Sequence, residues 1–161
     1  MIDELLANNA AYAASFDRSD LPRAPARRLA ILACMDARLD VFGALGLHEG
    51  DAQVIRNAGG LVTDDAIRSL AISQRFIGTE EIIVIHHTDC AALNFDDESF
   101  KRSLLEETGI EPRWSAETFS DLEESLRRSV AQIKSSPFIP HKDSVRGLLY
   151  EVGTGRLREV R

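Results

Sequence analysis

The chain has only two cysteines and no long apolar run, and both absences exclude classes of protein. No stretch approaches the roughly 18 apolar residues of a membrane-spanning helix, and the acidic opening Met1–Glu4 lacks the basic region of a signal peptide. In a reducing compartment, a lone pair of cysteines more often binds metal, acts in catalysis or lies buried than forms a disulfide. We therefore expect a cytoplasmic protein without membrane segments.

Basic residues are also scarce, since 19 Lys and Arg stand against 26 Asp and Glu. The net charge of −7 and the pI near 5.1 disfavour nucleic acid as a partner, because proteins that bind phosphates concentrate positive charge on one face. The apolar content of 44% is ordinary for a folded protein. A length of 161 residues suits one compact core, so we expect a single domain over residues 1–161.

Three short apolar runs, each ending in polar residues, predict buried strands at residues 29–33, 52–55 and 81–85. Helical patterns at 39–47 and 63–77 separate them. Strands that alternate with helices favour parallel pairing through right-handed crossovers. The predicted fold is therefore α/β, with a mostly parallel central sheet of about four strands flanked by helices.

The ends of the chain add further elements to this sheet. Apolar residues at helical spacing over residues 2–16 predict an N-terminal amphipathic helix whose stripe needs a partner surface. Residues 96–108 and 117–135 also have helical patterns. Residues 145–152 and 156–160, separated by Gly-Thr-Gly, predict a C-terminal edge strand and a hairpin partner.

Two cysteines and a histidine follow the predicted strands and could share one site. Ligands of open parallel sheets bind beyond the carboxyl ends of the strands, where Cys34, His87 and Cys90 would meet if the first and third strands are neighbours. Two thiolates and an imidazole favour zinc, and three protein ligands leave the open fourth position of a catalytic site. By itself the His-x-x-Cys spacing is weak, and a buried cysteine beside a core histidine is the plain alternative.

Neighbouring residues make the pattern more specific. Cys34-Met35-Asp36-Ala37-Arg38 and His87-Thr88-Asp89-Cys90 resemble, in order, the Cys-x-Asp-x-Arg and His-x-x-Cys motifs of the β-carbonic anhydrases. The stretch 56–60 also resembles the family, so the likeness covers roughly residues 28–93. In size and layout the chain is similar to the short, archaeal-type branch, which implies an N-terminal helix that packs across a homodimer. The chain departs from the family at Ala91 and His86, where family members usually or often have glycine.

The resemblance implies a Zn²⁺ cofactor held by Cys34, His87 and Cys90, and the reversible hydration of carbon dioxide to bicarbonate and a proton by zinc-bound hydroxide. Asp36 would accept a hydrogen bond from that hydroxide, and Arg38 would keep Asp36 ionised through a bidentate pair. The alternative for Asp36 and Arg38 is a local surface salt bridge. Because two thiolates cancel the zinc charge, we expect activity to rise with pH above neutrality.

Other residues near the motifs are each open to a functional or a structural role. Asn57, Gly59 and Gly60 would line the pocket, or form an ordinary strand-to-helix turn. Asp89 would orient a neighbouring ligand, or cap a helix. His86 points to the other side of its strand from His87 and is predicted to pack rather than bind metal.

Three other functions stay open at this point. Relatives of this fold use the same ligands to hydrolyse carbonyl sulfide or carbon disulfide, and sequence motifs do not separate these reactions from hydration of carbon dioxide. A non-catalytic zinc-binding homologue is the second alternative, favoured by Ala91 and His86 but opposed by the Asp36–Arg38 pair. A structural protein without metal is the third.

Overall fold

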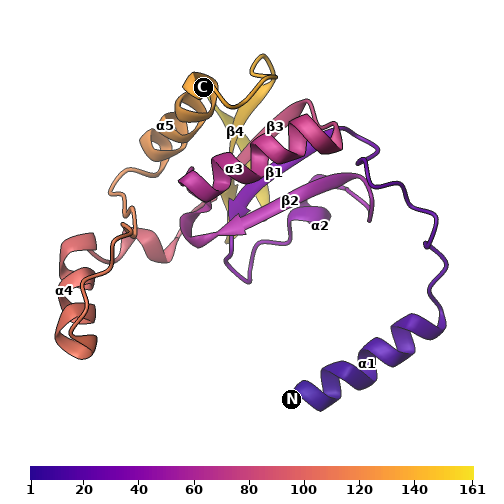
Figure 1. The fold of residues 1–161 in the computed structure, drawn as a ribbon, viewed down its shortest axis with the longest axis horizontal. Helices are drawn as coiled ribbons and strands as arrows, with labels where there is room; N and C mark the ends of the chain where they lie inside the picture. The colour runs from indigo at the N-terminus through magenta and orange to yellow at the C-terminus, as the bar shows by residue number, and fades with distance from the viewer.

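A five-stranded sheet organises the protein, whose computed structural model describes residues 1–161 (Figure 1). In the spatial order β2-β1-β3-β4-β5, the strands are Ala52–Asn57, Leu29–Cys34, Glu81–His87, Val145–Glu151 and Arg156–Val160. The first four run parallel, and β5 pairs antiparallel with β4 at the edge. The predicted α/β fold is therefore confirmed, and β1 and β3 are neighbours, as a shared site requires.

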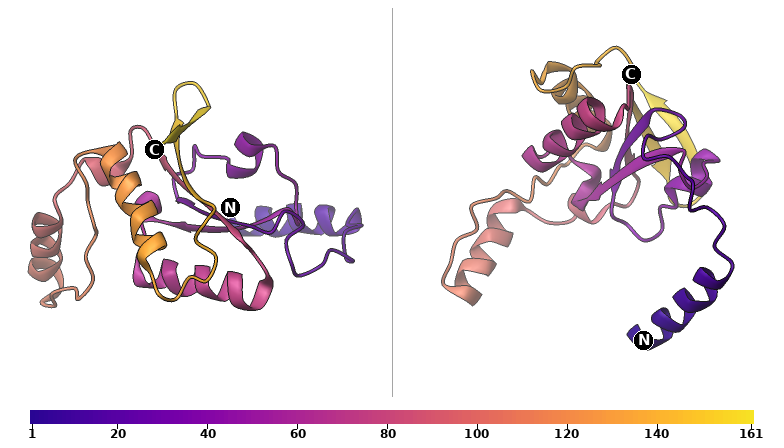
Figure 2. Two further views of the ribbon diagram at one scale, coloured as in Figure 1. Left: turned by 90° about the horizontal axis from the view of Figure 1, so that it is seen from above. Right: turned by 45° about the vertical axis from the view of Figure 1, so that its right-hand side comes forward.

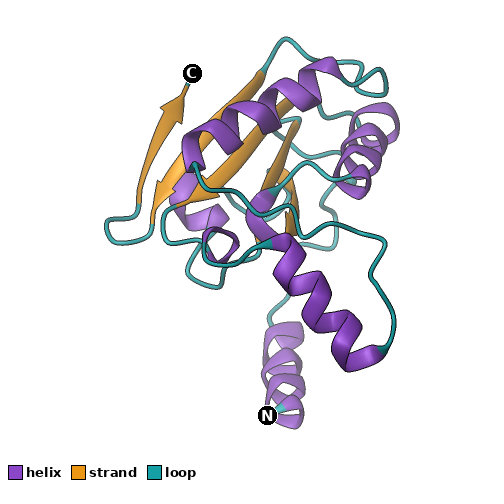
Figure 3. Ribbon diagram, turned by 90° about the vertical axis from the view of Figure 1, so that its left-hand side faces the viewer, coloured by secondary structure: helices purple, strands orange, loops and turns teal.

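The helices are α1 Ile2–Ala14, α2 Val41–Leu45, α3 Asp64–Ile72, α4 Asp97–Thr108 and α5 Leu122–Ser135. Three of them, α2, α3 and α5, pack on the two faces of the sheet. Helices α3 and α5 bury Leu70 and Leu126 against Leu32 and Val84 on one face (Figure 3). The short α2 packs Val41 on the opposite face. Short helical turns follow β2 (Ala58–Gly60), α3 (Ser73–Ile77) and Cys90 (Ala91–Leu93).

Two predicted boundaries are wrong in an instructive way. The helix expected at 117–135 begins only at Leu122, because the Asp121 side chain caps it by accepting a hydrogen bond from the Glu124 N–H. Phe119 therefore lies before the helix, not on its apolar stripe. The third strand runs two residues further than expected and includes both His86 and His87.

Helices α1 and α4 extend away from the sheet at different sides of the molecule, as the views in Figure 2 show. Neither buries a single residue. Leu5 and Leu6 of α1 are 60% and 63% exposed, so the apolar stripe predicted from the sequence has no surface within the chain to cover it. None of the helices has the length and apolar character needed to cross a membrane.

Candidate metal centre

The sheet brings Cys34, His87 and Cys90 together at the carboxyl ends of β1 and β3. Cys34 is the last residue of β1, His87 is the last residue of β3, and Cys90 follows after a two-residue turn. The two sulfurs lie 4.0 Å apart, and one ligand atom of each residue lies within 4.8 Å of the others. All three side chains are buried. The arrangement predicted from the sequence is thus a compact cluster of three potential metal ligands.

The His87 ring is oriented as a ligand ring would be. Its Nδ1 lies 2.9 Å from the Thr88 carbonyl oxygen, which can accept the Nδ1–H and so leave the lone pair on Nε2. That Nε2 is buried and has no hydrogen-bond partner. Metal-binding histidines typically donate their other ring N–H to a carbonyl or carboxylate. The unpartnered Nε2 therefore fits a metal ion.

The thiols are also arranged for a cation. The hydrogen bond from Cys90 lowers the pKa of Cys34 to about 4, whereas the same interaction raises the pKa of Cys90. Burial opposes protonation of His87, but the hydrogen bond and charge of Cys34 outweigh it and raise the pKa of His87. Without a cation, the Cys34–Cys90 pair thus favours one thiolate and opposes ionisation of the second thiol. A dication would offset two thiolates, and this soft donor set with a neutral imidazole suits Zn²⁺.

A paired carboxylate lies at the edge of the cluster. Arg38 donates from Nε to Asp36 Oδ1 at 3.0 Å and from Nη2 to Oδ2 at 2.8 Å, so the predicted bidentate pair is present. The Asp36 Oδ2 lies 3.8 Å from His87 Nε2. Hydrogen bonds from the Arg38 side chain and backbone lower the pKa of Asp36 well below its usual range. Asp36 is therefore ionised beside the potential metal ligands.

Asp89 contacts this pair rather than a ligand side chain. Its carboxylate accepts from Arg38 Nη1 at 2.7 Å, and its backbone carbonyl accepts from Nη2 at 3.0 Å. It does not cap the turn that begins at Ala91, and it has the uncommon φ of +56°. Asp89 thus fixes the far side of the Arg38 guanidinium.

The turn after β2 closes against the cluster. The Asn57 side chain donates to the Leu61 carbonyl at 2.8 Å and accepts from the Leu61 N–H at 2.9 Å. Gly59 and Gly60 have φ of +79° and +67°. A Cβ on Gly60 would lie 2.8 Å from the Cys34 nitrogen, so only glycine permits this approach. Asn57 and Gly59 line the cleft that leads to the cluster, while Gly60 is not part of this lining and lies against the main chain of Cys34.

His86 lies on the other side of β3 and packs, as its position in the strand predicts. It is fully buried, and its ring stacks on Phe119 with centroids 5.6 Å apart. Its Nε2 lies 3.2 Å from the Gly60 carbonyl oxygen. Burial lowers the pKa of His86 to about 4. His86 is absent from the group of potential ligands.

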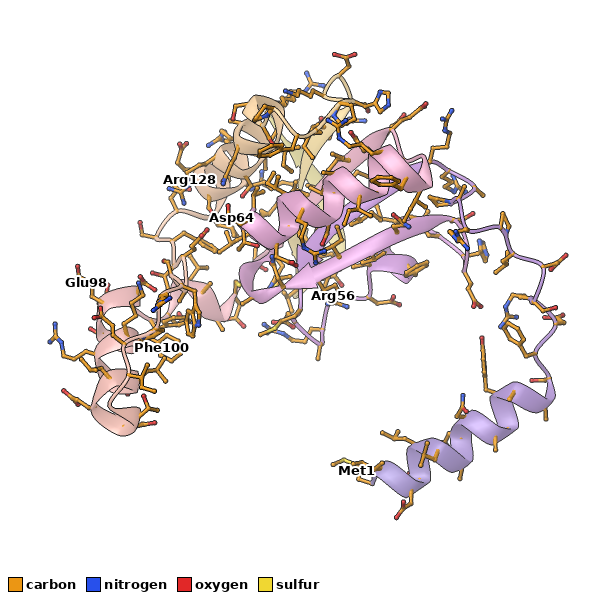
Figure 4. The ribbon with its side chains drawn as sticks, viewed as in Figure 1. Met1, Arg56, Asp64, Glu98, Phe100 and Arg128 are labelled. Carbon is orange, nitrogen blue, oxygen red and sulfur yellow. The ribbon has the colours of Figure 1, made fainter.

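A cleft of about 860 Å³ leads to the cluster, lined by Cys34, Asp36 and Cys90 and by apolar residues of the neighbouring elements. Its lining also includes Phe95, Phe100 and Trp114. The ring of Phe100, which lies on α4 and is labelled in Figure 4, packs against each of the other two. No motif in the sequence identified these aromatic residues. The site therefore combines a metal cluster, an ionised carboxylate and an apolar approach.

The sequence reasoning also missed Arg56 as a functional residue. It belongs to the cleft lining and donates hydrogen bonds to two backbone carbonyls beside the cluster. Its position, one residue before the carboxyl end of a parallel strand, is the signal that could have identified it.

Comparisons with known proteins agree with this geometry. The profile of the family described as carbonic anhydrase matches residues 29–157. Beta-carbonic anhydrase 1 of Mycobacterium tuberculosis (strain ATCC 25618 / H37Rv) is 54% identical over 158 residues, which cover 98% of this chain and 96% of the relative. A carbon disulfide hydrolase of Acidithiobacillus thiooxidans is 38% identical, with 82% and 76% covered. The crystal structure of carbonic anhydrase from Streptococcus mutans superposes with a TM-score of 0.93 at 45% identity, covering 99% of this chain and 97% of that one. The chain belongs to the β-class of the carbonic anhydrase family.

Proposed function

We propose that this protein catalyses the reversible hydration of carbon dioxide to bicarbonate and a proton, with Zn²⁺ held by Cys34, His87 and Cys90. The observation that carries this proposal is the ionised Asp36 carboxylate, held by Arg38 and 3.8 Å from His87 Nε2. A cluster that only stored zinc would need no such group. When bound, zinc supplies the positive charge that lowers the pKa of a water molecule at its open position.

The residues of the chain supply orientation. An ionised carboxylate only accepts hydrogen bonds, so Asp36 accepts one from the O–H of the attacking oxygen. This orientation leaves a lone pair of that oxygen directed at the carbon of carbon dioxide. Arg38 keeps Asp36 ionised and is itself held by Asp89. The apolar lining of the cleft suits an uncharged, linear substrate. Asn57, Gly59 and Gly60 hold the floor of the cleft in place.

Stopped-flow measurement of carbon dioxide hydration on protein of known zinc content tests this function. We expect Asp36→Ala to retain zinc and to lose roughly 10²–10³-fold in kcat, the usual cost of removing one oriented polar group from an active site. Asp36→Asn, which keeps the shape but not the charge, should be similarly impaired. Wild-type rates in both variants would contradict the role of Asp36.

Hydrolysis of carbon disulfide or carbonyl sulfide is the second candidate reaction. The 38% identical relative named a carbon disulfide hydrolase and the apolar cleft support it. Rates for carbon dioxide, carbonyl sulfide and carbon disulfide, measured on one preparation, distinguish the reactions. We expect carbon dioxide to be the preferred substrate, because the 54% identical relative over nearly the whole chain is named a carbonic anhydrase. A non-catalytic zinc protein would bind zinc and turn over none of the three.

We further propose that the protein works in the cytoplasm as a homodimer of single-domain subunits similar to the short branch of the family, with small molecules rather than nucleic acid as partners. The exposed apolar residues of α1 support dimerisation, since Ile2, Leu5 and Leu6 are each at least 60% exposed. Light scattering should give twice the chain mass, and Leu5→Asp with Leu6→Asp should give one chain mass. A monomeric wild-type protein would contradict the proposal.

A further inference from the structure

Arg56 is held at two backbone carbonyls beside the metal cluster. It belongs to β2 and pairs in register with Ala33 near the end of β1, and Figure 4 labels it beside β2. Its Nε donates to the Cys34 carbonyl at 2.9 Å, and its Nη2 donates to the Asp36 carbonyl at 2.7 Å. Although the residue is exposed, its guanidinium is thus fixed by two hydrogen bonds to main-chain oxygens two residues apart.

These two carbonyls belong to the segment that supplies both a metal ligand and the ionised carboxylate. Cys34 ends β1, and the chain then turns away so that Asp36 reaches the edge of the cluster. The main chain here is otherwise tied by the Met35 N–H to the Asn57 carbonyl at 2.9 Å and by the Leu39 N–H to the Asp36 carbonyl at 3.1 Å. Arg56 is the one side chain that joins the carbonyls of Cys34 and Asp36.

Two arginines therefore act on the same segment in different ways. Arg38 holds the carboxylate of Asp36, and Arg56 holds its main chain. The Asp36 carboxylate lies 3.8 Å from His87 Nε2, and a displacement of about 1 Å in an active site can cost ~10²-fold in rate. A planar guanidinium can bridge two acceptors at once, whereas the ammonium of lysine is a point charge on a flexible chain.

We infer that Arg56 is a positioning residue, which sets the main chain at Cys34 and Asp36 and thereby the geometry of both the metal ligand and the carboxylate. The inference rests on the proposed function for its effect on rate. Its effect on the metal site does not depend on which substrate the protein turns over.

The test compares the wild-type protein with Arg56→Gln and Arg56→Lys. Residues that support a metal site from outside the ligand shell typically cost 10–100-fold in affinity or activity when removed. We expect Arg56→Gln to raise the Kd for zinc about 10–100-fold, measured by competition with a chromophoric chelator. It should lower kcat by a similar factor and leave KM within about twofold of the wild-type value. The zinc Kd and kcat of Arg56→Lys should lie between those of the wild-type protein and Arg56→Gln, because lysine can reach only one of the two carbonyls at a time.

Two readouts separate positioning from general stability. The cobalt-substituted protein should show shifted visible absorption bands in Arg56→Gln, and free guanidinium at low millimolar concentration should restore the bands and kcat. Arg146→Gln is the matched control, since Arg146 also projects from a strand and makes two hydrogen bonds, to Glu159 at 2.8 and 2.6 Å, away from the site. It should leave the zinc Kd and kcat unchanged.

Wild-type zinc affinity and cobalt bands in Arg56→Gln would overturn the inference. The inference would also fail if Arg56→Gln lost zinc affinity and kcat only in proportion to its melting temperature, to the same extent as Arg146→Gln and without recovery in guanidinium. If Arg56→Gln does not fold, Arg56→Lys provides the same comparison. If the wild-type protein hydrates no carbon dioxide, the proposed function fails, while zinc affinity and the cobalt bands still decide the role of Arg56.

Discussion

Helices α4 and α5 have similar lengths and the same kind of start, yet they differ completely in burial. Each begins after an aspartate that accepts a hydrogen bond from a backbone N–H three residues later. Helix α5 buries four residues against the sheet, whereas α4 buries none. Local sequence therefore decides where a helix forms, and the surface it meets decides what it contributes.

The same contrast divides the molecule into two regions. The body, which is the sheet with α3 and α5, carries the core and fixes the metal cluster. The arms, which are α1 and α4, extend from it with exposed apolar residues. Changes in the body should affect the protein at any concentration. Changes in the arms should act on contacts with other molecules or on the lining of the cleft.

The largest effect should come from the body at the metal cluster. We expect His87→Ala to lose its zinc, measured by elemental analysis, and to lose more activity than the 10–100-fold typical of an outer support residue. His86→Ala should keep its zinc, because His86 faces Phe119 and not the cluster. Retention of zinc by His87→Ala with its loss in His86→Ala would reverse the assignment.

Core packing should separate body from arm next. Leu126 of α5 is fully buried, and Leu126→Ala should lower the free energy of unfolding by about 2–5 kcal/mol. Leu105 of α4 is 41% exposed, and Leu105→Ala should change it by no more than roughly 0.5 kcal/mol. Urea denaturation measures both, and equal costs would show that α4 is packed as firmly as α5.

Much of the body could be predicted from the sequence. Buried parallel strands are short apolar runs, so 29–33 identified β1 to within one residue. The carboxyl ends of neighbouring parallel strands meet, so the positions of Cys34 and His87 after two apolar runs predicted a shared site on the condition that β1 and β3 are neighbours, which the strand order confirms. The bidentate contact of Arg38 with Asp36 was implied by the resemblance of residues 34–38 to the family motif, and the structure contains it.

Other features depend on contacts that no local pattern contains. The position of Arg56 near the end of β2 indicates that it lies close to the site, but its partners are carbonyls 20 and 22 positions away, and backbone carbonyls have no sequence signature. Phe100 and Trp114 meet only because the chain returns along α4. The start of α5 was misplaced because Phe119 fits the helical spacing, although Phe119 is buried before the helix, against His86 and the apolar cluster that contains Cys34 and Cys90.

Glycine substitutions sharpen the comparison further. Gly60 in the body and Gly109 at the end of α4 both have positive φ, and Ala at either position should cost about 1–2 kcal/mol of backbone strain. At Gly109 an added Cβ meets nothing within 4 Å, but at Gly60 it would lie 2.8 Å from the Cys34 nitrogen. Gly60→Ala should therefore be the more destabilising in thermal melts, and should also weaken zinc binding. Equal melting temperatures would contradict this.

The smallest effect should be a pH-dependent loosening of the α4 arm. The Ala116 N–H donates to Asp97, and the Ser115 hydroxyl and Lys101 also contact this carboxylate, so the returning chain is tied to the start of α4. The hydrogen bond from Ala116 is the main cause of a lowered pKa at Asp97. Because the pKa is lowered, the contact stabilises the arm fully at pH values above the pKa of an unfolded aspartate, about 3.9. This stabilisation is lost as the pH falls through the pKa of Asp97 in the folded protein.

Trp114, the one tryptophan of the chain, lies beside this contact and reports on the arm alone. As the pH falls below about 4, we expect its fluorescence to change before the far-ultraviolet circular dichroism of the sheet does. In Asp97→Asn the carboxylate is absent, so this early change should vanish, and the spectrum at neutral pH should already resemble that of the acid form. If the fluorescence of wild type and variant instead changed together with the circular dichroism, the arm would unfold with the body, and the division between the two regions would fail.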